Sequence, residues 1–174
     1  MRTIDVADLG QHLGEEMAVS EWLEISQSRI DRFAEATGDH QWIHVDPGRA
    51  AAALPERTTI AHGFLTLALV TALLQQGITI GRIRMAINYG LDRVRFVSPL
   101  PAGARVRGRF TLAAVAEAGG GIQVTWSVTV EREHGDRPCC VAEWLVRYYP
   151  VDEAAKGKIV LTVGGSTAGT AFKQ

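Results

Sequence analysis

Two side chains that can move protons stand close together in the segment EATGDHQWIHVDPGRA, residues 35–50. On a continuous α-helix, Asp39 and His44 would lie about 140° apart around the axis and could not share a ligand. Gly38 predicts the end of the preceding helix, so both side chains can converge from an irregular loop. A carboxylate beside an imidazole can exchange protons with one bound water. A structural alternative stays open, because an aspartate after a helix is also an ordinary turn residue.

A second candidate feature is the His-Gly pair at residues 62–63, which begins the apolar segment GFLTLALVTALLQQ. The free N–H groups in the first turn of a helix lie at the positive end of its dipole. The N–H of Gly63 could therefore hold an enolate or oxyanion, and one such donor contributes about 3 kcal/mol in a transition state. In the structural alternative, the glycine lets a helix touch the sheet, and His62 caps the helix.

Some of these side chains could instead be metal ligands. His40, His44 and Asp46, together with the distant His62, offer suitable atoms. They lack the paired helical spacing that makes a zinc motif specific, so we expect no metal at this loop.

Helical patterns surround both features. One helix is predicted within residues 26–38, with a serine cap at its start and a glycine at its end. A short second helix is predicted within residues 46–53, from an aspartate cap, a proline and a run of alanines. The third spans residues 63–76 and is apolar on almost every face, so protein should wrap it. We expect Trp42 and Ile43 to be wall residues of the core.

Alternating apolar and polar residues predict strands within residues 105–112, 122–133 and 139–149. The joins EAGGG and EHGDRP are short and suit antiparallel hairpins. An apolar helix followed by an antiparallel meander predicts an α+β fold in which the sheet curls round the helix. Such a sheet leaves edges exposed, so we expect edge pairing into a dimer.

Length and composition indicate one soluble domain. We place this domain at residues 1–150 of the 174-residue chain, followed by a glycine-rich appendage at 151–174. Disorder and a short edge strand both stay open for the appendage. The adjacent Cys139 and Cys140 form no CxxC or zinc pattern and indicate buried thiols of a reducing cytosol. The first residues carry acids where a secretory signal would be apolar, so we expect a cytoplasmic protein.

The charge pattern excludes some partners. A net charge of -1 gives no overall field that would recruit nucleic acid or an anionic membrane. The most apolar stretch is too short to cross a bilayer. Arg93, Arg95 and the alternate arginines of residues 105–109 could meet phosphates, but such a row is usually a solvated strand face.

Three segments resemble the MaoC-like (R)-specific enoyl-CoA hydratases in order and spacing: FAEATGDHQWIHVDPGRA, TTIAHGFLTLAL and NYGLDRVRFVSPLPAGARVR. The resemblance runs from about Ser20 to Tyr149. It joins an Asp-x4-His loop, a His-Gly helix start and a Tyr-Gly-x4-Arg-Phe strand entry. It implies the hot-dog fold, in which an antiparallel sheet wraps a long central helix, and a homodimer whose sheets pair edge to edge.

By this resemblance, Asp39 and His44 hold the water that adds to C3 of a trans-2-enoyl thioester and deliver a proton to C2 on the same face. The product is an (R)-3-hydroxyacyl thioester. The N–H of Gly63 polarises the thioester carbonyl, with His62 and Thr66 as neighbouring candidates for substrate binding. The resemblance implies an acyl-CoA substrate and neither a cofactor nor a metal. Which of Asp39 and His44 gives the proton stays open.

The loop departs from the Asp-x-Asn-Pro-x-His pattern of many members. Gln41 and Trp42 replace the Asn-Pro pair, so the loop loses a proline restraint and gains an indole that can reshape the acyl pocket. Both are candidates for substrate binding. A hot-dog acyl-CoA thioesterase, an acyl-carrier-protein dehydratase and a non-catalytic acyl-thioester binding module stay open as alternatives, and a purely structural subunit is the weakest.

Overall fold

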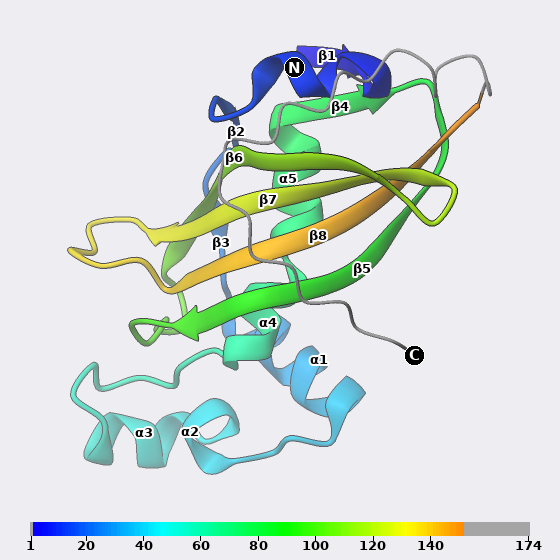
Figure 1. Ribbon diagram of the computed structural model, residues 1–174. Helices are drawn as coiled ribbons and strands as arrows, with labels where there is room; N and C mark the ends of the chain where they lie inside the picture. Colours follow the sequence, from blue (N-terminus) through cyan, green and yellow to red (C-terminus); the bar gives the residue numbers. More distant parts are fainter. Residues whose placement is uncertain (1, 152–174) are drawn as a thin grey trace.

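The computed structural model describes residues 2–151, in which a curved antiparallel sheet lies against a helix (Figure 1). The helical elements are η1 (Val6–His12), α1 (Gln27–Thr37), α2 (Trp42–Val45), α3 (Pro47–Ala53), α4 (Gly63–Ala68) and α5 (Val70–Gly77). The strands are β1 (Arg2–Asp5), β2 (Glu16–Val19), β3 (Leu23–Glu24), β4 (Ile78–Gly81), β5 (Ile83–Phe96), β6 (Arg105–Ala118), β7 (Gly121–Arg132) and β8 (Cys140–Pro150). Most of the predicted appendage, residues 152–174, lies outside the described part. No helix in the described part has the length and apolar character needed to span a membrane.

The main sheet has six strands in the order β2-β6-β7-β8-β5, with β3 also paired to β6. All of its pairings are antiparallel. The predicted meander is confirmed, because β6, β7 and β8 bury apolar side chains at alternate positions. The expected α+β class is therefore confirmed.

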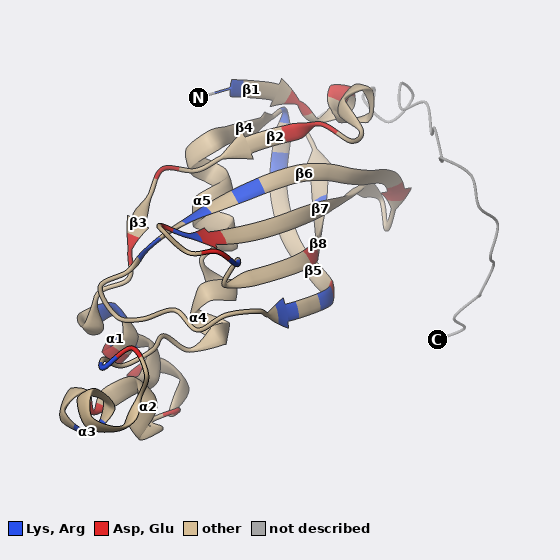
Figure 2. Cartoon of the chain, turned by 90° about the vertical axis from the view of Figure 1, so that its left-hand side faces the viewer, with Lys and Arg blue, Asp and Glu red and all other residues tan. Residues whose placement is uncertain are grey.

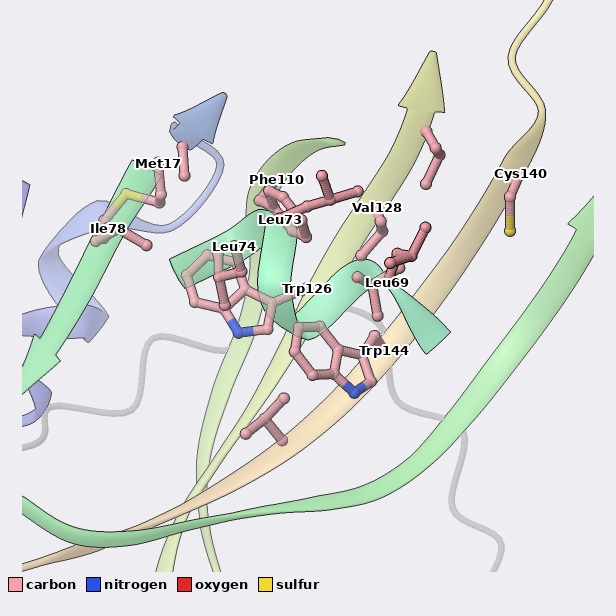
Figure 3. Packing of buried hydrophobic residues seen from close by; sticks show 14 of the residues in the cluster. Met17, Leu69, Leu73, Leu74, Ile78, Phe110, Trp126, Val128, Cys140 and Trp144 are labelled. Carbon is pink, nitrogen blue, oxygen red and sulfur yellow. The ribbon is translucent and has the colours of Figure 1, made fainter. Parts of the chain in front are cut away.

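The core lies between the inner face of this sheet and α5. Figure 3 shows the indoles of Trp126 and Trp144 beside leucines of the helical segment. These two tryptophans lie opposite each other on β7 and β8. Trp126 is fully buried, and its indole N–H donates a hydrogen bond of 3.3 Å to the hydroxyl of Tyr148. Aromatic side chains of this size dominate the apolar area that a core buries.

The two cysteines are buried free thiols, as predicted. Burial raises the pKa of Cys140 to about 11, with a smaller contribution from the neighbouring Cys139. The side chain of Cys140 is therefore a thiol at neutral pH, and thiolate chemistry is disfavoured there.

The predicted helix over residues 63–76 is interrupted at Leu69, between α4 and α5. Leu69 keeps right-handed helical angles, and its N–H still donates to the carbonyl of Leu65. The next two residues, Val70 and Thr71, are β-branched, which lowers the local helix propensity.

Complete wrapping of this helix was also predicted, and that prediction is wrong for a single chain. Phe64 is 69% exposed, and Ala72, Gln75 and Gln76 are exposed on α5. The reason is that one sheet curls around only one side of the helix.

Strand β5 was not predicted as a full strand. It has 14 residues at the edge of the sheet, and none of them is buried. Apolar side chains do recur at every second position from Ile83 to Leu91, so a strand signal was present in the sequence but was not used in the prediction. Its register with β8 shifts between Ile83 and Met85, between Asn88 and Gly90, and between Asp92 and Arg95.

The N-terminal elements and β4 were also not predicted. β1 and β4 form a separate parallel pair beyond the C-terminal end of α5 (Figure 1). β2 and β3 pair with β6. These strands have two to four residues each, which is too short for a periodic pattern to show.

The arginine row on β6 is a paired surface. Figure 2 shows positive and negative residues interspersed over the strands. Arg105 bonds Glu133, Arg107 bonds Glu131, and Arg109 bonds both Glu16 and Glu131. These ion pairs satisfy the guanidinium groups, which favours the interpretation of a solvated strand face over a phosphate site.

Replacing Trp126 by Ala should destabilise the fold by about 3–5 kcal/mol, because it removes a fully buried indole and leaves a cavity. Urea unfolding followed by circular dichroism measures the loss. The matched control is Trp22→Ala, in which the lost indole is partly exposed and is stacked by Arg107 at 4.6 Å. That control should lose about 1 kcal/mol. Equal losses in the two variants would contradict the placement of Trp126 at the centre of the core.

Candidate active site

Three side chains from separate elements meet at the N-terminal end of α4. Asp39 follows α1, His44 lies in α2, and His62 directly precedes α4. One ligand atom from each lies within 4.8 Å of the others. The structure therefore brings the predicted Asp39 and His44 pair together, with His62 as a third member.

The flanking helices hold this arrangement by the caps that the sequence predicted. Ser26 accepts from the N–H of Arg29 at the start of α1, and Gly38 ends that helix with a φ of 76°. Asp46 accepts from the N–H of Arg49 at the start of α3. The intervening segment was predicted to be an irregular loop, but residues 42–45 form the single helical turn α2.

The orientation of His44 is set by a backbone carbonyl. Its Nδ1 lies 2.6 Å from the carbonyl oxygen of Ile60, which can only accept, so Nδ1 carries a hydrogen. In the neutral ring, Nε2 is then left with a free lone pair. Burial lowers the pKa of His44 below 6.5, and the nearby His62 lowers it further, while the bond to Ile60 and the charge of Asp39 raise it. At neutral pH His44 is therefore a neutral ring with a free basic nitrogen.

A partly buried pair of polar side chains, Gln27 and Thr59, holds the backbone of His44, and sequence reasoning missed it. The side-chain amide of Gln27 donates to the carbonyl of His44 at 2.8 Å. The Gln27 carbonyl accepts from the hydroxyl of Thr59, which is fully buried. Glutamine in the first turn of a helix is ordinary, so no local signal could have identified this link across 32 residues.

Asp39 presents its carboxylate at the mouth of the site. Its side chain is 55% exposed, and Oδ1 lies 3.4 Å from the N–H of Gln41. Oδ2 lies 3.9 Å from Nε2 of His62, whereas the backbone oxygen of Asp39 accepts from that nitrogen at 2.9 Å. The backbone of Asp39 is thus held inward while its carboxylate stays accessible.

His62 does not cap the helix in the way the structural alternative expected. It makes no side-chain cap hydrogen bond to α4. Its ring is buried, stacks on His44 with centroids 3.7 Å apart, and lies 5.0 Å from the ring of Phe33.

The stacked rings are poorly arranged for a shared metal ion. The planes of His44 and His62 differ by only 25°, so lone pairs in those planes run side by side. A tetrahedral metal site needs lone pairs that converge on one point. One nitrogen of each ring already donates to a backbone oxygen. These two nitrogens are therefore not available to a metal ion while the backbone bonds are kept.

Gly63 lies at the first position of α4, and within the described residues its N–H makes no hydrogen bond. A Cβ added there would lie 2.7 Å from the ring of Phe96. A larger residue would have to displace the partly exposed ring of Phe96, so contact between this helix and β5 favours glycine, in agreement with the structural alternative. The same position leaves a free amide at the helix N-terminus, so the oxyanion role of this N–H stays a prediction.

The remaining candidates take different places. Thr66 is buried in α4, one turn after His62. Gln41 is exposed and precedes α2. Trp42 is partly exposed, with Arg49 4.2 Å above its ring, and is not a member of the core cluster. Ile43 is also partly exposed and outside that cluster, so the prediction that Trp42 and Ile43 form walls of the core is wrong.

A groove lies between α4, α5 and β5, and sequence reasoning did not identify it; its lining begins at Phe64, next to Gly63, and includes none of Asp39, His44 and His62. Its first section has a volume of about 340 Å³ and is lined in part by Phe64, Tyr89 and Leu91. Its second section, of about 460 Å³, extends to Tyr148 and to β4. Thr71, Asn88 and Trp144 line both sections.

Comparisons with known proteins agree with this geometry. The MaoC like domain matches residues 8–134. The 3-hydroxyacyl-thioester dehydratase Z of Mycobacterium tuberculosis is 53% identical over 150 residues, which cover 85% of this chain and 99% of the relative. Nodulation protein N of Rhizobium leguminosarum bv. viciae is 47% identical over 156 residues, or 87% of this chain and 97% of the relative.

Among solved structures, an unliganded R-hydratase from Pseudomonas aeruginosa superposes with a TM-score of 0.64 at 19% identity, covering 90% of this chain and 92% of that one. This similarity confirms the expected hot-dog fold. The matched domain and the named relatives likewise confirm the expected class of enzyme, a hydro-lyase. The chain therefore belongs to the MaoC-like dehydratase family.

Proposed function

We propose that this protein catalyses the (R)-specific hydration of trans-2-enoyl-CoA to (R)-3-hydroxyacyl-CoA, and the reverse dehydration. One observation carries the proposal: a neutral His44 with a free Nε2 lies beside the Asp39 carboxylate, next to the free N–H of Gly63. The name of the Mycobacterium tuberculosis relative, a 3-hydroxyacyl-thioester dehydratase, supports the same chemistry.

In the hydration direction, Nε2 of His44 takes a proton from a water that Asp39 holds by accepting its other hydrogen. The water oxygen bonds to C3, and the electron pair of the C2–C3 double bond moves toward the thioester carbonyl. The N–H of Gly63 donates to the resulting enolate oxygen. The imidazolium of His44, stabilised by Asp39, then returns a proton to C2 on the same face.

The thioester makes C2 acidic once its carbonyl is polarised, so the proposed reaction uses neither a cofactor nor a metal. The acyl-CoA is the substrate, and the enzyme acts in the cytoplasm. Nucleic acid and membrane are not partners in this proposal, because the interspersed surface charges offer no single-sign field to attract them.

The acyl chain is proposed to occupy the groove along α5. Thr71 follows Gly63 by eight positions, which corresponds to about 12 Å along a helix. A short acyl group bound at Gly63 would not reach Thr71, whereas a long chain would pass it.

The functional unit is proposed to be a homodimer that pairs along β5. This edge strand exposes Met85, Ile87, Tyr89 and Leu91, each by more than 40%. Pairing there would cover these apolar side chains and close the groove from outside.

Replacing Asp39 by Asn, or His44 by Ala, should lower the hydration rate by about 100- to 10,000-fold, because each change removes a proton-handling group. Loss of the enoyl absorbance of crotonyl-CoA measures the rate. The matched control is His40→Ala, an exposed histidine of the same loop, which should retain activity. Release of free thiol from saturated acyl-CoA would instead indicate a thioesterase, and full activity in either active-site variant would contradict the proposal.

The pH dependence should report on His44. Because its pKa is below 6.5, kcat/KM should be constant at neutral pH and fall as the pH decreases through that pKa. The lowered pKa of His44 also affects the free energy of unfolding. At acidic pH the folded state binds fewer protons than the unfolded state, so the contribution of His44 to stability is complete above pH 6.5. It is lost as the pH falls through the pKa of the folded state. Measuring kcat/KM from pH 4.5 to 8 tests this, and an acid limb centred above about 6.5 would contradict it.

Filling the groove should change chain-length preference. Thr71→Phe should lower kcat/KM for a long trans-2-enoyl-CoA by about 10- to 100-fold and leave crotonyl-CoA within about twofold, because only the long chain passes this position. Gln76→Phe on the exposed side of α5 is the matched control. Equal losses for both substrates would show that the chain binds elsewhere.

Sedimentation velocity tests the homodimer. The wild type should sediment as a dimer, and Ile87→Asp on β5 should weaken its Kd by at least about tenfold, because it buries a charge in the interface. Val19→Asp, at an exposed position of β2, is the matched control. A monomeric wild type at micromolar concentration would contradict the proposed interface.

A further inference from the structure

His62 connects the three parts of the candidate site. Its Nε2 lies 2.9 Å from the backbone oxygen of Asp39, and its ring stacks on that of His44. The residue that follows it is Gly63, whose N–H begins α4. The side chain is only 3% exposed, so it acts from beneath the site and has little access to a substrate.

The hydrogen bonds determine which nitrogen of His62 carries a hydrogen. A backbone oxygen can only accept, so Nε2 of His62 is the donor to Asp39. Nδ1 is buried and has no partner within the described residues. The geometry therefore assigns a hydrogen to Nε2 and leaves Nδ1 without a partner in the described part of the chain.

Few charged groups face this ring. The carboxylate of Asp39 lies 3.9 Å from Nε2, and His44 covers one face. On the α1 side the neighbour is Phe33, which carries no charge.

Filling space would not require a histidine here. An aromatic hydrocarbon ring could stack between Phe33 and His44 and would leave no unpaired buried nitrogen. Such a ring would lack the N–H donor at Nε2, which hydrogen-bonds to the backbone oxygen of Asp39.

We infer that His62 is a positioning residue. Its Nε2–H fixes the peptide of Asp39, and its ring face fixes the plane of His44, so that the carboxylate and the free imidazole nitrogen face one water beside the N–H of Gly63. This role rests on the proposed hydratase function, because His62 acts only through those groups.

Two substitutions separate the donor from the ring. His62→Gln can place an amide donor where Nε2 lies but removes the ring, and His62→Phe keeps the ring but removes the donor. His62→Phe should lower kcat by about 30- to 100-fold with KM within about twofold, because the reacting groups are misplaced while the binding surface is kept. His62→Gln should recover kcat to within about fivefold of the wild type. His40→Phe and His40→Gln are matched controls on the exposed neighbour.

A second measurement does not depend on turnover. Backbone order parameters and imidazole resonances, measured by NMR, should show increased motion at residues 39–41 and a changed His44 environment in His62→Phe. In His62→Gln the loop should keep its wild-type order parameters. A wild type that hydrates no enoyl thioester would refute the proposed function, and this measurement would still decide whether His62 orders the loop.

The role would be overturned if His62→Phe kept kcat within about threefold of the wild type. It would also be overturned if both variants lost kcat in proportion to thermal stability, or if residues 39–41 kept wild-type order parameters in His62→Phe.

Discussion

Burial of the inner face of the sheet against α5 is the constraint on which the rest of this structure depends. The indole of Trp126 and its neighbours on β6 and β8 require an apolar partner, and α5 supplies it. Once α5 lies in the concave face of the sheet, α4 must emerge at one end of that face (Figure 1). The free N–H of Gly63 is therefore placed at the rim, where α1 and α2 can bring side chains to meet it.

The chemistry of the site depends on backbone acceptors more than on charge. The carbonyl of Ile60 selects the tautomer of His44, and the carbonyl of Asp39 selects that of His62. Carbonyl oxygens of a folded backbone cannot rotate independently, so they specify ring orientation without a further ionised group. Burial then keeps His44 neutral at physiological pH. Asp39 remains accessible, which allows a carboxylate and a neutral base to coexist at short range.

Features with a local cause could be predicted from the sequence. The caps at Ser26 and Asp46, the terminator Gly38 and the alternation of β6 to β8 each arise from neighbouring residues. The closeness of Asp39 and His44 was also predictable, because a helix had to end between residues 37 and 39. The bond from Gln27 to Thr59 and the stacking of His62 were not, because they join segments that only the fold brings together. Strand β5 was predictable in part, because its apolar residues alternate from Ile83 to Leu91, but its position at the exposed edge of the sheet depends on the fold.

The irregular backbone of β5 has a consequence for how copies of this protein can associate. Three register shifts interrupt its pairing with β8, and Arg93 adopts a φ of 49° within the last of them. Such irregularities bend and twist an edge strand, so only part of its length presents evenly spaced amide and carbonyl groups. In the proposed homodimer, an incoming strand could therefore be matched over only a limited stretch of this edge.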